Sequence, residues 1–248
     1  SCNTVFYGIG ADMDAVDPYA LPDMSRAFGL GQPVDMPYFP SATSGVIPDP
    51  EWKRENINDG WATGDNIQLS IGQGFMTGTP MQMAVAYAAI ANGGYVLTPY
   101  VVDRTQAEGE EPVQVGERQV KNELPLTDQQ IVWIQQALRA QTTDPYGYGT
   151  SRLFGDFPFS ISGKTGTAQN DRPNEGNRPH SWFAAYAPYP VDYGESDIAS
   201  IVMVENVGEG VTYAAPVTKI IYQHWMDTYG TGMEPIDHRW IIGSRWWG

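Results

Sequence analysis

The sequence is poor in the residues that form covalent crosslinks and metal centres. Its 248 residues include a single cysteine, Cys2, so no disulfide can form within the chain. The simplest interpretation of that cysteine is a small, buried apolar side chain. The three histidines, His180, His224 and His238, are scattered, and none stands at metal-ligand spacing from another histidine or from the cysteine. We therefore expect no metal site and no cofactor.

Basic residues and long apolar runs are also scarce. Lysine and arginine total 14 against 29 aspartates and glutamates, which gives a net charge of −15. Nucleic acids and anionic membrane surfaces require a basic face on their partner, so this charge argues against both. No run of about 18 apolar residues is present, and the sequence predicts no membrane-spanning helix.

Apolar and aromatic side chains, by contrast, are abundant. Apolar residues make up 42% of the chain, with 8 tryptophans and 14 tyrosines, which indicates a globular protein able to bury one core. The chain starts at Ser1, inside a motif discussed below, without a signal peptide or an initiator methionine. We therefore expect it to be part of a longer protein.

The first sixty residues are rich in proline, glycine and aspartate and show little periodicity. They predict one short helix near 1–13, with Val5, Phe6 and Ile9 on one face, followed by long loops. Residues 33–61 in particular are expected to be mostly irregular.

The pattern is clearer in the middle of the chain. Thr79-Pro80 combines an N-cap with a proline at the first helical position, and the apolar run 81–91 predicts a buried helix that ends at 92–94. Residues 95–102 are expected to form a strand. The glycine-containing acidic segment 105–116 is expected to be an exposed loop.

The second half predicts a helix, a loop, two strands and a closing helix. A capping box opens the first helix at 127–130, and the helix is expected to end at about residue 141. The later segments are the loop 144–159, the strands 181–187 and 198–205, and an amphipathic helix at 215–229 whose Val217, Ile220, Ile221 and Trp225 should point inward. This order predicts an α+β fold in which helices flank an antiparallel sheet within one domain.

Two short motifs carry possible chemistry, Ser1-Cys2-Asn3 and Lys164-Thr165-Gly166-Thr167. Ser-x-Asn and Lys-Thr-Gly are two of the three signatures of active-site serine enzymes that acylate on a β-lactam or a peptide. The third, Ser-x-x-Lys, supplies the nucleophile, and none of the four lysines has a serine three residues before it. Each motif alone is short enough to arise by chance.

The lysine motif suits the binding of a carboxylate. A lysine on a strand edge offers a fixed positive charge, and the hydroxyls of Thr165 and Thr167 can bind the same carboxylate. Gly166 would let a substrate backbone lie close to the strand. The N–H of Thr167 could donate to an oxyanion if the strand edge is unpaired.

Other short segments have more than one interpretation. Ser1 could relay a proton and Asn3 could hold a substrate amide, but a serine at a helix start is also an ordinary N-cap. The stretch Ile71-Gly72-Gln73-Gly74 could be an anion-binding loop ahead of a helix. A tight turn is favoured, because the next helix cap lies several residues later.

Longer segments resemble a known family. They are 65–74, 79–84, 87–94, 163–169, 182–188 and Ala215-Pro216, and they follow the family order from Ser1 to about Met226. Together they resemble the transpeptidase domain of class B penicillin-binding proteins. The start, Ser-Cys-Asn-Thr-Val-Phe-Tyr, is more similar to the elongation-type enzymes than to the division-type ones. The resemblance implies a penicillin-binding transpeptidase or serine β-lactamase-like fold, of which 1–229 would be the C-terminal part, and 230–248 a tail of unknown role.

The resemblance also implies an activity. Such enzymes crosslink peptidoglycan stem peptides at the outer face of the bacterial cytoplasmic membrane through a serine acyl-enzyme, and β-lactams acylate the same serine. By resemblance, Ser1, Asn3 and Lys164 are catalytic residues. Thr165, Gly166 and Thr167 would bind substrate.

Partners and alternatives follow from the same resemblance. The expected partners are stem peptides, β-lactams, the missing N-terminal part of the same protein, which would carry the nucleophile and the membrane anchor, and a glycosyltransferase of the cell-wall machinery; nucleic acid is not expected. The chain alone should be inactive and poorly stable. Two alternatives stay open: a non-catalytic β-lactam-sensing or scaffold module, and a class D-type β-lactamase.

Overall fold

A computed structural model of the chain describes residues 2–38, 43–146, 149–158, 160–169, 178–188 and 196–229. Ser1 and the tail 230–248 lie outside the described residues. The division of the chain at residue 229 therefore stays a prediction.

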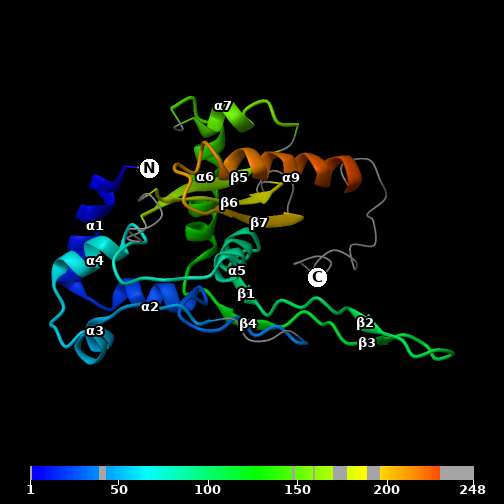
Figure 1. Ribbon diagram of the computed structural model, residues 1–248, viewed down its shortest axis with the longest axis horizontal. Coiled ribbons are helices and arrows are strands. Elements are labelled where there is room, and N and C mark those ends of the chain that lie inside the picture. The colour runs from blue at the N-terminus through cyan, green and yellow to red at the C-terminus, as the bar shows by residue number, and fades with distance from the viewer. Residues whose placement is uncertain are drawn as a thin grey trace.

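The first seventy residues hold more helix than the sequence suggests. They form helices along one side of the molecule, drawn in blue to cyan in Figure 1. Asp49 caps one of them by accepting the N–H of Trp52 at 2.7 Å, with Pro50 at the first helical position, a signal that the sequence analysis overlooked. The helices are α1 (Asn3–Val16), α2 (Ala20–Ala27), α3 (Pro50–Asn56) and α4 (Thr63–Leu69). The expectation of long loops in the first sixty residues was wrong at two helices, α2 and α3, and α4 follows directly after them.

The buried helix predicted after Thr79 is confirmed as α5 (Pro80–Ala91). Its capping box is reciprocal, because Thr79 Oγ1 accepts the N–H of Gln82 at 3.1 Å and Gln82 Oε1 accepts that of Thr79 at 2.8 Å. The Gln82 amide also donates to the carbonyls of Gln32 and Ser44 at 2.7 Å. One buried glutamine thus ties the start of α5 to the preceding loop.

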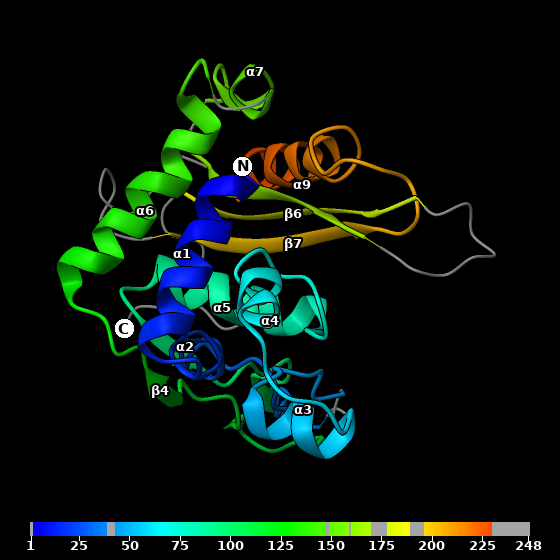
Figure 2. The same cartoon turned by 90° about the vertical axis from the view of Figure 1, so that its left-hand side faces the viewer.

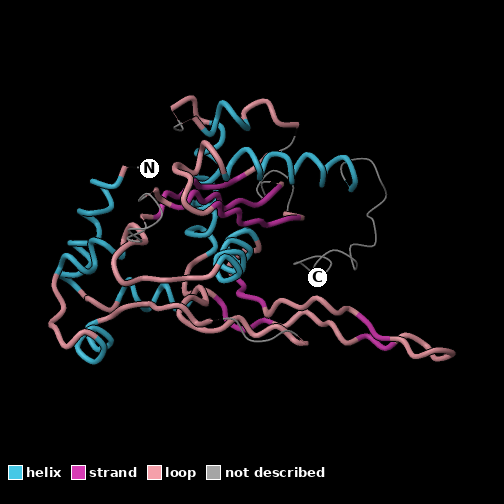
Figure 3. Tube along the Cα trace, in the orientation of Figure 1, coloured by secondary structure: helices cyan, strands magenta, loops and turns pink. Residues whose placement is uncertain are grey.

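A two-stranded arm extends from the body beyond α5. The predicted strand 95–102 is short, since β1 (Tyr95–Leu97) pairs with β4 (Val120–Glu123), and the chain between them runs outward and back. The arm includes the small strands β2 (Arg104–Thr105) and β3 (Val113–Gln114) and reaches away from the sheet in Figure 3. The predicted exposed loop is therefore a hairpin.

The main sheet is antiparallel, as predicted. Within the described residues its strand order is β5 (Ser162–Ala168), β6 (His180–Ala187), β7 (Ile198–Val204), which leaves β5 at an edge. Figures 1 and 2 show α9 (Ala214–Tyr229) on one face of the sheet and α5 on the other, while α6 (Asp128–Thr143) contacts β5. The short α7 (Thr150–Phe154) lies within the segment predicted to be a loop. The α+β architecture is confirmed.

The core lies on both faces of this sheet. Phe183, Ala185 and Tyr222 are fully buried in the cluster beneath α9, where Phe183 stacks on Phe154 with ring centroids 5.3 Å apart. On the other face, α5 contributes Ala89, Ile90 and further apolar side chains. These two layers hold β6 rigidly behind β5.

The predicted inward face of α9 is wrong at three of its four residues, and the fourth, Trp225, is half-buried. Val217 and Ile221 are exposed, and Ile220 is 70% exposed, whereas Ala215, Thr218 and Tyr222 are buried. The helix is rotated because the small residues and Tyr222 fit against the sheet, and Lys219 donates to the carbonyl of Leu153 beside it. An apolar stripe is therefore left on the outer face.

Candidate functional site

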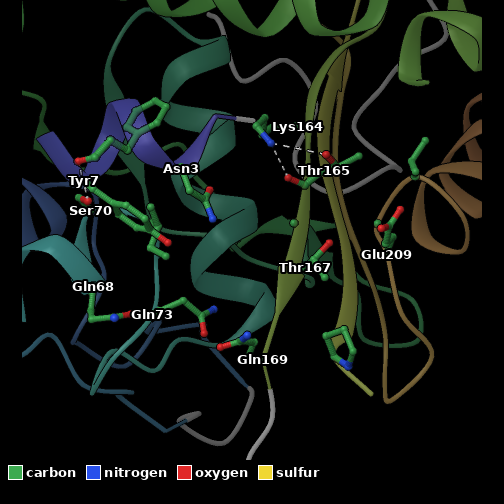
Figure 4. A pocket seen from close by; sticks show the side chains of 16 residues that line it. Asn3, Tyr7, Gln68, Ser70, Gln73, Lys164, Thr165, Thr167, Gln169 and Glu209 are labelled. Carbon is green, nitrogen blue, oxygen red and sulfur yellow. Dashed lines mark hydrogen bonds between the residues drawn. The ribbon is translucent and has the colours of Figure 1, made fainter. Parts of the chain in front are cut away.

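A cleft of about 920 Å³ opens between the edge of β5 and the helices α1 and α4 (Figure 4). The start of α1, the end of α4 with the turn after it, the strand β5 and the loop after β7 all contribute side chains to its lining. It brings together Asn3, Lys164, Thr165, Gly166 and Thr167, which are far apart in the sequence. Ser1 lies outside the described residues.

Lys164 is held at the strand edge by its neighbour. Its Nζ donates to the carbonyl oxygen of Thr165 at 2.8 Å and lies 3.5 Å from that residue's hydroxyl. The side chain is half-buried, and this burial lowers the pKa of the Lys164 amine below its ordinary value. An anion in the cleft would favour the charged amine again, so the site is electrostatically suited to a carboxylate.

The hydrogen-bonding direction of β5 follows from the same contact. In an antiparallel strand the N–H and C=O of one residue point to the same side, and successive residues alternate. Because the Lys164 side chain reaches the carbonyl of Thr165, that carbonyl faces the open edge. The N–H of Thr167, two residues on, then faces the open edge as well.

Gly166 is explained by the residues around it. A methyl group there would lie 3.0 Å from Cβ of Trp182, its cross-strand partner. The backbone of Gly210 also packs on this pair, since a Cβ on Gly210 would lie 2.3 Å from the carbonyl of Trp182 and 2.7 Å from that of Gly166. A side chain at position 166 would therefore crowd its own fold, and the predicted contact of Gly166 with substrate stays a prediction.

Asn3 is the first residue of α1, and the helix presents it to the cleft. The N-cap position belongs to Cys2, which makes no side-chain cap. Because Ser1 lies outside the described residues, both interpretations of it stay predictions. Cys2 is exposed, with Sγ 3.1 Å from the Thr4 hydroxyl, which corrects the expectation that it is buried.

Helix α1 is positioned by close contact with α4. A Cβ on Gly10 would lie 2.9 Å from the Ser70 hydroxyl and 3.0 Å from the carbonyl of Asn66, so only glycine allows the two helices to approach this closely. Asp14 accepts the indole N–H of Trp61 at 3.0 Å and the amide of Asn66 at 2.9 Å. These contacts fix α1 against α4, and so they fix where Asn3 lies in the cleft.

The turn after α4 also reaches the cleft. Gly72 and Gly74 have φ values of +72° and +78°, and the stretch follows the C-terminal end of α4 while α5 starts only at Pro80. The tight-turn interpretation is confirmed, and the anion-binding one is wrong because no helix N-terminus follows directly.

The sequence analysis missed several cleft residues. They are Phe6, Tyr7, Gln68, Ser70, Gln73, Gln169 and Glu209, among others. The sequence held a signal for only one of them: Gln73 stands between Gly72 and Gly74, a pattern typical of a tight turn that presents its middle side chain. Isolated glutamines on a helix and at a strand end carry no sequence signature.

No group of three or more histidine, cysteine or carboxylate side chains that could hold a metal ion occurs in the described part of the chain. Within those same ranges, no helix is both long enough and apolar enough to cross a membrane. The described lining of the cleft offers one amine, one carboxylate, hydroxyls, amides and backbone groups.

Comparison with known proteins gives one consistent result. The family model for the penicillin-binding protein transpeptidase domain matches residues 1–223. The peptidoglycan D,D-transpeptidase MrdA of Acinetobacter baumannii is 33% identical over 240 residues, which is 92% of this chain and 34% of that protein. The chain thus spans about a third of the length of the curated relatives that it matches.

Solved structures agree with the sequence matches. PBP2 of Pseudomonas aeruginosa in complex with WCK 5153 superposes with a TM-score of 0.74 at 29% identity, covering 95% of this chain and 50% of that one. Penicillin-binding protein A of Mycobacterium tuberculosis, as a ceftriaxone acyl-enzyme complex, gives a TM-score of 0.72 at 25% identity, covering 90% and 46%. The matches extend across both walls of the cleft.

Proposed function

Since the chain belongs to the penicillin-binding protein transpeptidase family, with elongation-type class B enzymes among its relatives, we propose that it builds two of the three corners of a peptidoglycan D,D-transpeptidase active site. Asn3, with Ser1, forms the second-motif corner. Lys164, Thr165 and Thr167 form the carboxylate-binding corner. The Ser-x-x-Lys nucleophile comes from another part of the same protein.

One observation carries this proposal. Asn3 on α1 and the residues of the lysine motif on β5 line the same cleft from opposite sides (Figure 4), although more than 150 residues separate them in the sequence. A chance match to two short motifs would have no reason to place them across one cavity. Their convergence supports a shared substrate.

The chemistry of each group follows from its setting. The stem peptide ends in a carboxylate, which the Lys164 amine and the hydroxyls of Thr165 and Thr167 bind at the β5 edge. The amide of Asn3 bonds to the peptide backbone from the opposite wall. The outward N–H of Thr167 donates to the oxyanion that develops when the serine hydroxyl attacks the penultimate D-Ala carbonyl.

The reaction balances without a cofactor. Attack forms the serine ester and breaks the peptide bond to the terminal D-Ala, whose amine leaves with the proton from the serine hydroxyl. The amine of a second stem then attacks the ester, forms the crosslink and returns a proton to the serine oxygen. Ser1 relays protons in these steps. A β-lactam acylates the same serine when its ring amide bond breaks, and the ring nitrogen takes up the proton and stays attached to the acyl group.

The rest of the predicted setting belongs to this proposal. Val5 and Ile9 are 55% and 44% exposed on the side of α1 opposite Gly10, and they form a surface on which the nucleophile-bearing part can pack. We place the intact protein at the outer face of the cytoplasmic membrane, with stem peptides, β-lactams and a glycosyltransferase as partners. The 248-residue chain alone should not acylate.

Labelling with a fluorescent penicillin tests the proposal. The isolated chain should stay unlabelled, and the intact protein should label at one serine. Replacing Lys164 with alanine in the intact protein should slow labelling by about tenfold or more, because a charge-assisted contact is lost. Covalent labelling of the isolated chain would contradict the assignment of the nucleophile.

The two alternatives give different results in the same assays. A sensor module would label but would not release D-Ala from a stem pentapeptide or join two stems. A β-lactamase would hydrolyse a chromogenic cephalosporin with many turnovers, whereas a transpeptidase should remain acylated. Either result from the intact protein would replace the proposed activity.

A further inference from the structure

Three glutamine side chains gather at one end of the cleft. Gln68 is on α4, Gln73 lies in the turn after it, and Gln169 follows the last residue of β5. Figure 4 shows the amides of Gln73 and Gln169 turned toward one another from the two walls, with Gln68 beside them, at the end away from Lys164. The arrangement joins segments about a hundred residues apart in the sequence.

The backbone around Gln73 is shaped to present this side chain. Gly72 and Gly74 on either side both adopt left-handed φ values, +72° and +78°, which other residues rarely tolerate. The N–H of Gln73 donates to the carbonyl of Gln68 at 2.9 Å. A Cβ on Gly74 would lie 3.1 Å from Cβ of Gln68, so the turn packs directly on the helix. Gln68 and Gln73 therefore hold a fixed relation to each other.

The three amides have no hydrogen-bond partner anywhere in the described structure. Other glutamines of this chain behave differently: Gln82 caps α5 and bonds to two loop carbonyls, and Gln135 donates to the carbonyl of Ile90 at 2.8 Å. These two bonded glutamines are buried, whereas Gln68 and Gln169 are exposed and Gln73 is half-buried, so the three cleft amides are accessible to a ligand.

The charge of the cleft restricts what they can bind. Lys164 is the only cation and Glu209 the only carboxylate among the described residues of the lining, and Figure 4 shows both apart from the glutamines. A charged ligand group would be matched by an opposite charge, which none of the described lining residues at this end offers. Each amide has a donor and an acceptor, a pattern complementary to another amide.

The position of this end relative to Lys164 defines which part of the ligand it meets. Gln169 lies two residues beyond Thr167, and an extended strand of that length spans about 7 Å, close to the reach of two extended peptide residues. A stem peptide with its terminal carboxylate at Thr165 and Thr167 would reach the glutamines with a residue that precedes the two terminal D-Ala residues.

We propose that Gln68, Gln73 and Gln169 form a subsite that recognises a neutral carboxamide on the stem peptide, upstream of its D-Ala-D-Ala end. The subsite distinguishes an amidated stem from one with a free carboxylate at the same position. This inference rests on the proposed transpeptidase function. Beyond that function, it states which side-chain group the preferred stem peptide carries.

The test uses the intact protein and two synthetic stem pentapeptides that differ only in a side-chain carboxamide or carboxylate at the residue before D-Ala-D-Ala. Calorimetry measures binding, and D-Ala release gives kcat and KM. The carboxamide peptide should bind more tightly. Gln73→Ala and Gln169→Ala should each raise the dissociation constant and KM for that peptide about fivefold, one hydrogen bond each, with little change in kcat.

Two further variants separate recognition from structure. Gln73→Glu keeps the shape of the side chain but adds a negative charge that repels the carboxylate peptide. A third peptide, with an amine at the same position, is attracted by that charge. The difference between the dissociation constants of these two peptides should therefore be larger for Gln73→Glu than for the unsubstituted protein. Gln136→Ala, on an exposed position of α6 that does not line the cleft, should change neither constant.

The outcomes are distinct for the two proposals. Equal binding of both peptides by the unsubstituted protein, or binding that ignores Gln73→Ala and Gln169→Ala, overturns the subsite even if turnover is normal. Binding that depends on these glutamines without any D-Ala release or penicillin labelling supports the subsite and overturns the proposed transpeptidase activity.

Discussion

The two walls of the cleft differ in how well the rest of this chain supports them. The β5 wall is backed by β6, by α9 and by a core in which Phe183 and Tyr222 are fully buried. The α1 wall is held mainly by α4, with a smaller contact to α2, while Val5 and Ile9 are 55% and 44% exposed. The lysine motif is therefore supported within the chain, whereas the Ser-x-Asn motif rests on a helix with one apolar side uncovered.

The largest expected effect lies behind the β5 wall. Phe183→Ala removes a fully buried ring that stacks on Phe154, and should lower the free energy of unfolding by about 3–5 kcal/mol. Denaturant unfolding measures this. A loss below 1 kcal/mol would show that the β5 wall is not the better supported of the two.

The next effect compares two glycines on α1. Gly10→Ala places a Cβ 2.9 Å from the Ser70 hydroxyl, whereas Gly8 has nothing within 4 Å. We expect Gly10→Ala to be less stable than Gly8→Ala by about 1–3 kcal/mol, because crowding there opposes the same gain in helix propensity. Equal stabilities in denaturant unfolding would mean that α1 does not depend on its contact with α4.

The third prediction concerns the charge on the β5 wall. Burial lowers the pKa of the Lys164 amine, so its charge is lost at a pH below the ordinary lysine value of 10.5. The rate of penicillin acylation by the intact protein should fall by up to about tenfold per pH unit above the lowered pKa, through loss of carboxylate binding. In Lys164→Arg this alkaline decline should be absent, because arginine keeps its charge.

The same shift has a defined effect on stability. Between the lowered folded-state pKa of Lys164 and 10.5, the unfolded state binds more protons than the folded state. Stability therefore gains a favourable contribution as pH rises through this window, as the unfavourable burial of the charged amine is relieved. Lys164→Met should remove that contribution from the pH dependence of unfolding.

The smallest effect is expected on the open side of α1. In the isolated chain Ile9→Ala should change the free energy of unfolding by less than about 0.5 kcal/mol, because that side chain is 44% exposed there. In the intact protein the same substitution should be more damaging if another part of that protein covers the helix. Identical small effects in both would argue that the α1 wall stays open.

Local signals explain which elements were predictable. Helices α5 and α6 begin at capping boxes around Thr79 and Thr127, and β6 and β7 show strong strand patterns, so their bounds agree with prediction within about two residues. Helices α2 and α7 have no side-chain cap to mark their start, and they were missed. Such helices are fixed by tertiary contacts rather than by their own sequence.

Orientation was harder to predict than existence. The apolar side of α9 looked like its core face, yet the sheet accepts Ala215, Thr218 and Tyr222, and Ile220 lies outside. Sequence periodicity locates an apolar stripe but does not say what covers it, and α9 has small and aromatic residues that pack better on the strands.

The candidate site divides in the same way. The lysine motif could be placed on a strand edge in advance, because its residues are consecutive. The glutamines could not, since Gln68, Gln73 and Gln169 meet only through the packing of α4 against α1 and of the turn beside β5. A site assembled from single residues of separate elements is visible only in three dimensions.

The pairing of Gly210 with Gly166 has a consequence for inhibition. Where these two backbones meet, the cleft wall consists of main-chain atoms, and a Cβ on Gly210 would collide with the carbonyl of Trp182 at 2.3 Å. Resistance by substitution acts through side chains, and here there is no side chain to change without disturbing the fold. Inhibitors that bond to the backbone of β5 near Gly166 would therefore address the part of this target least free to mutate.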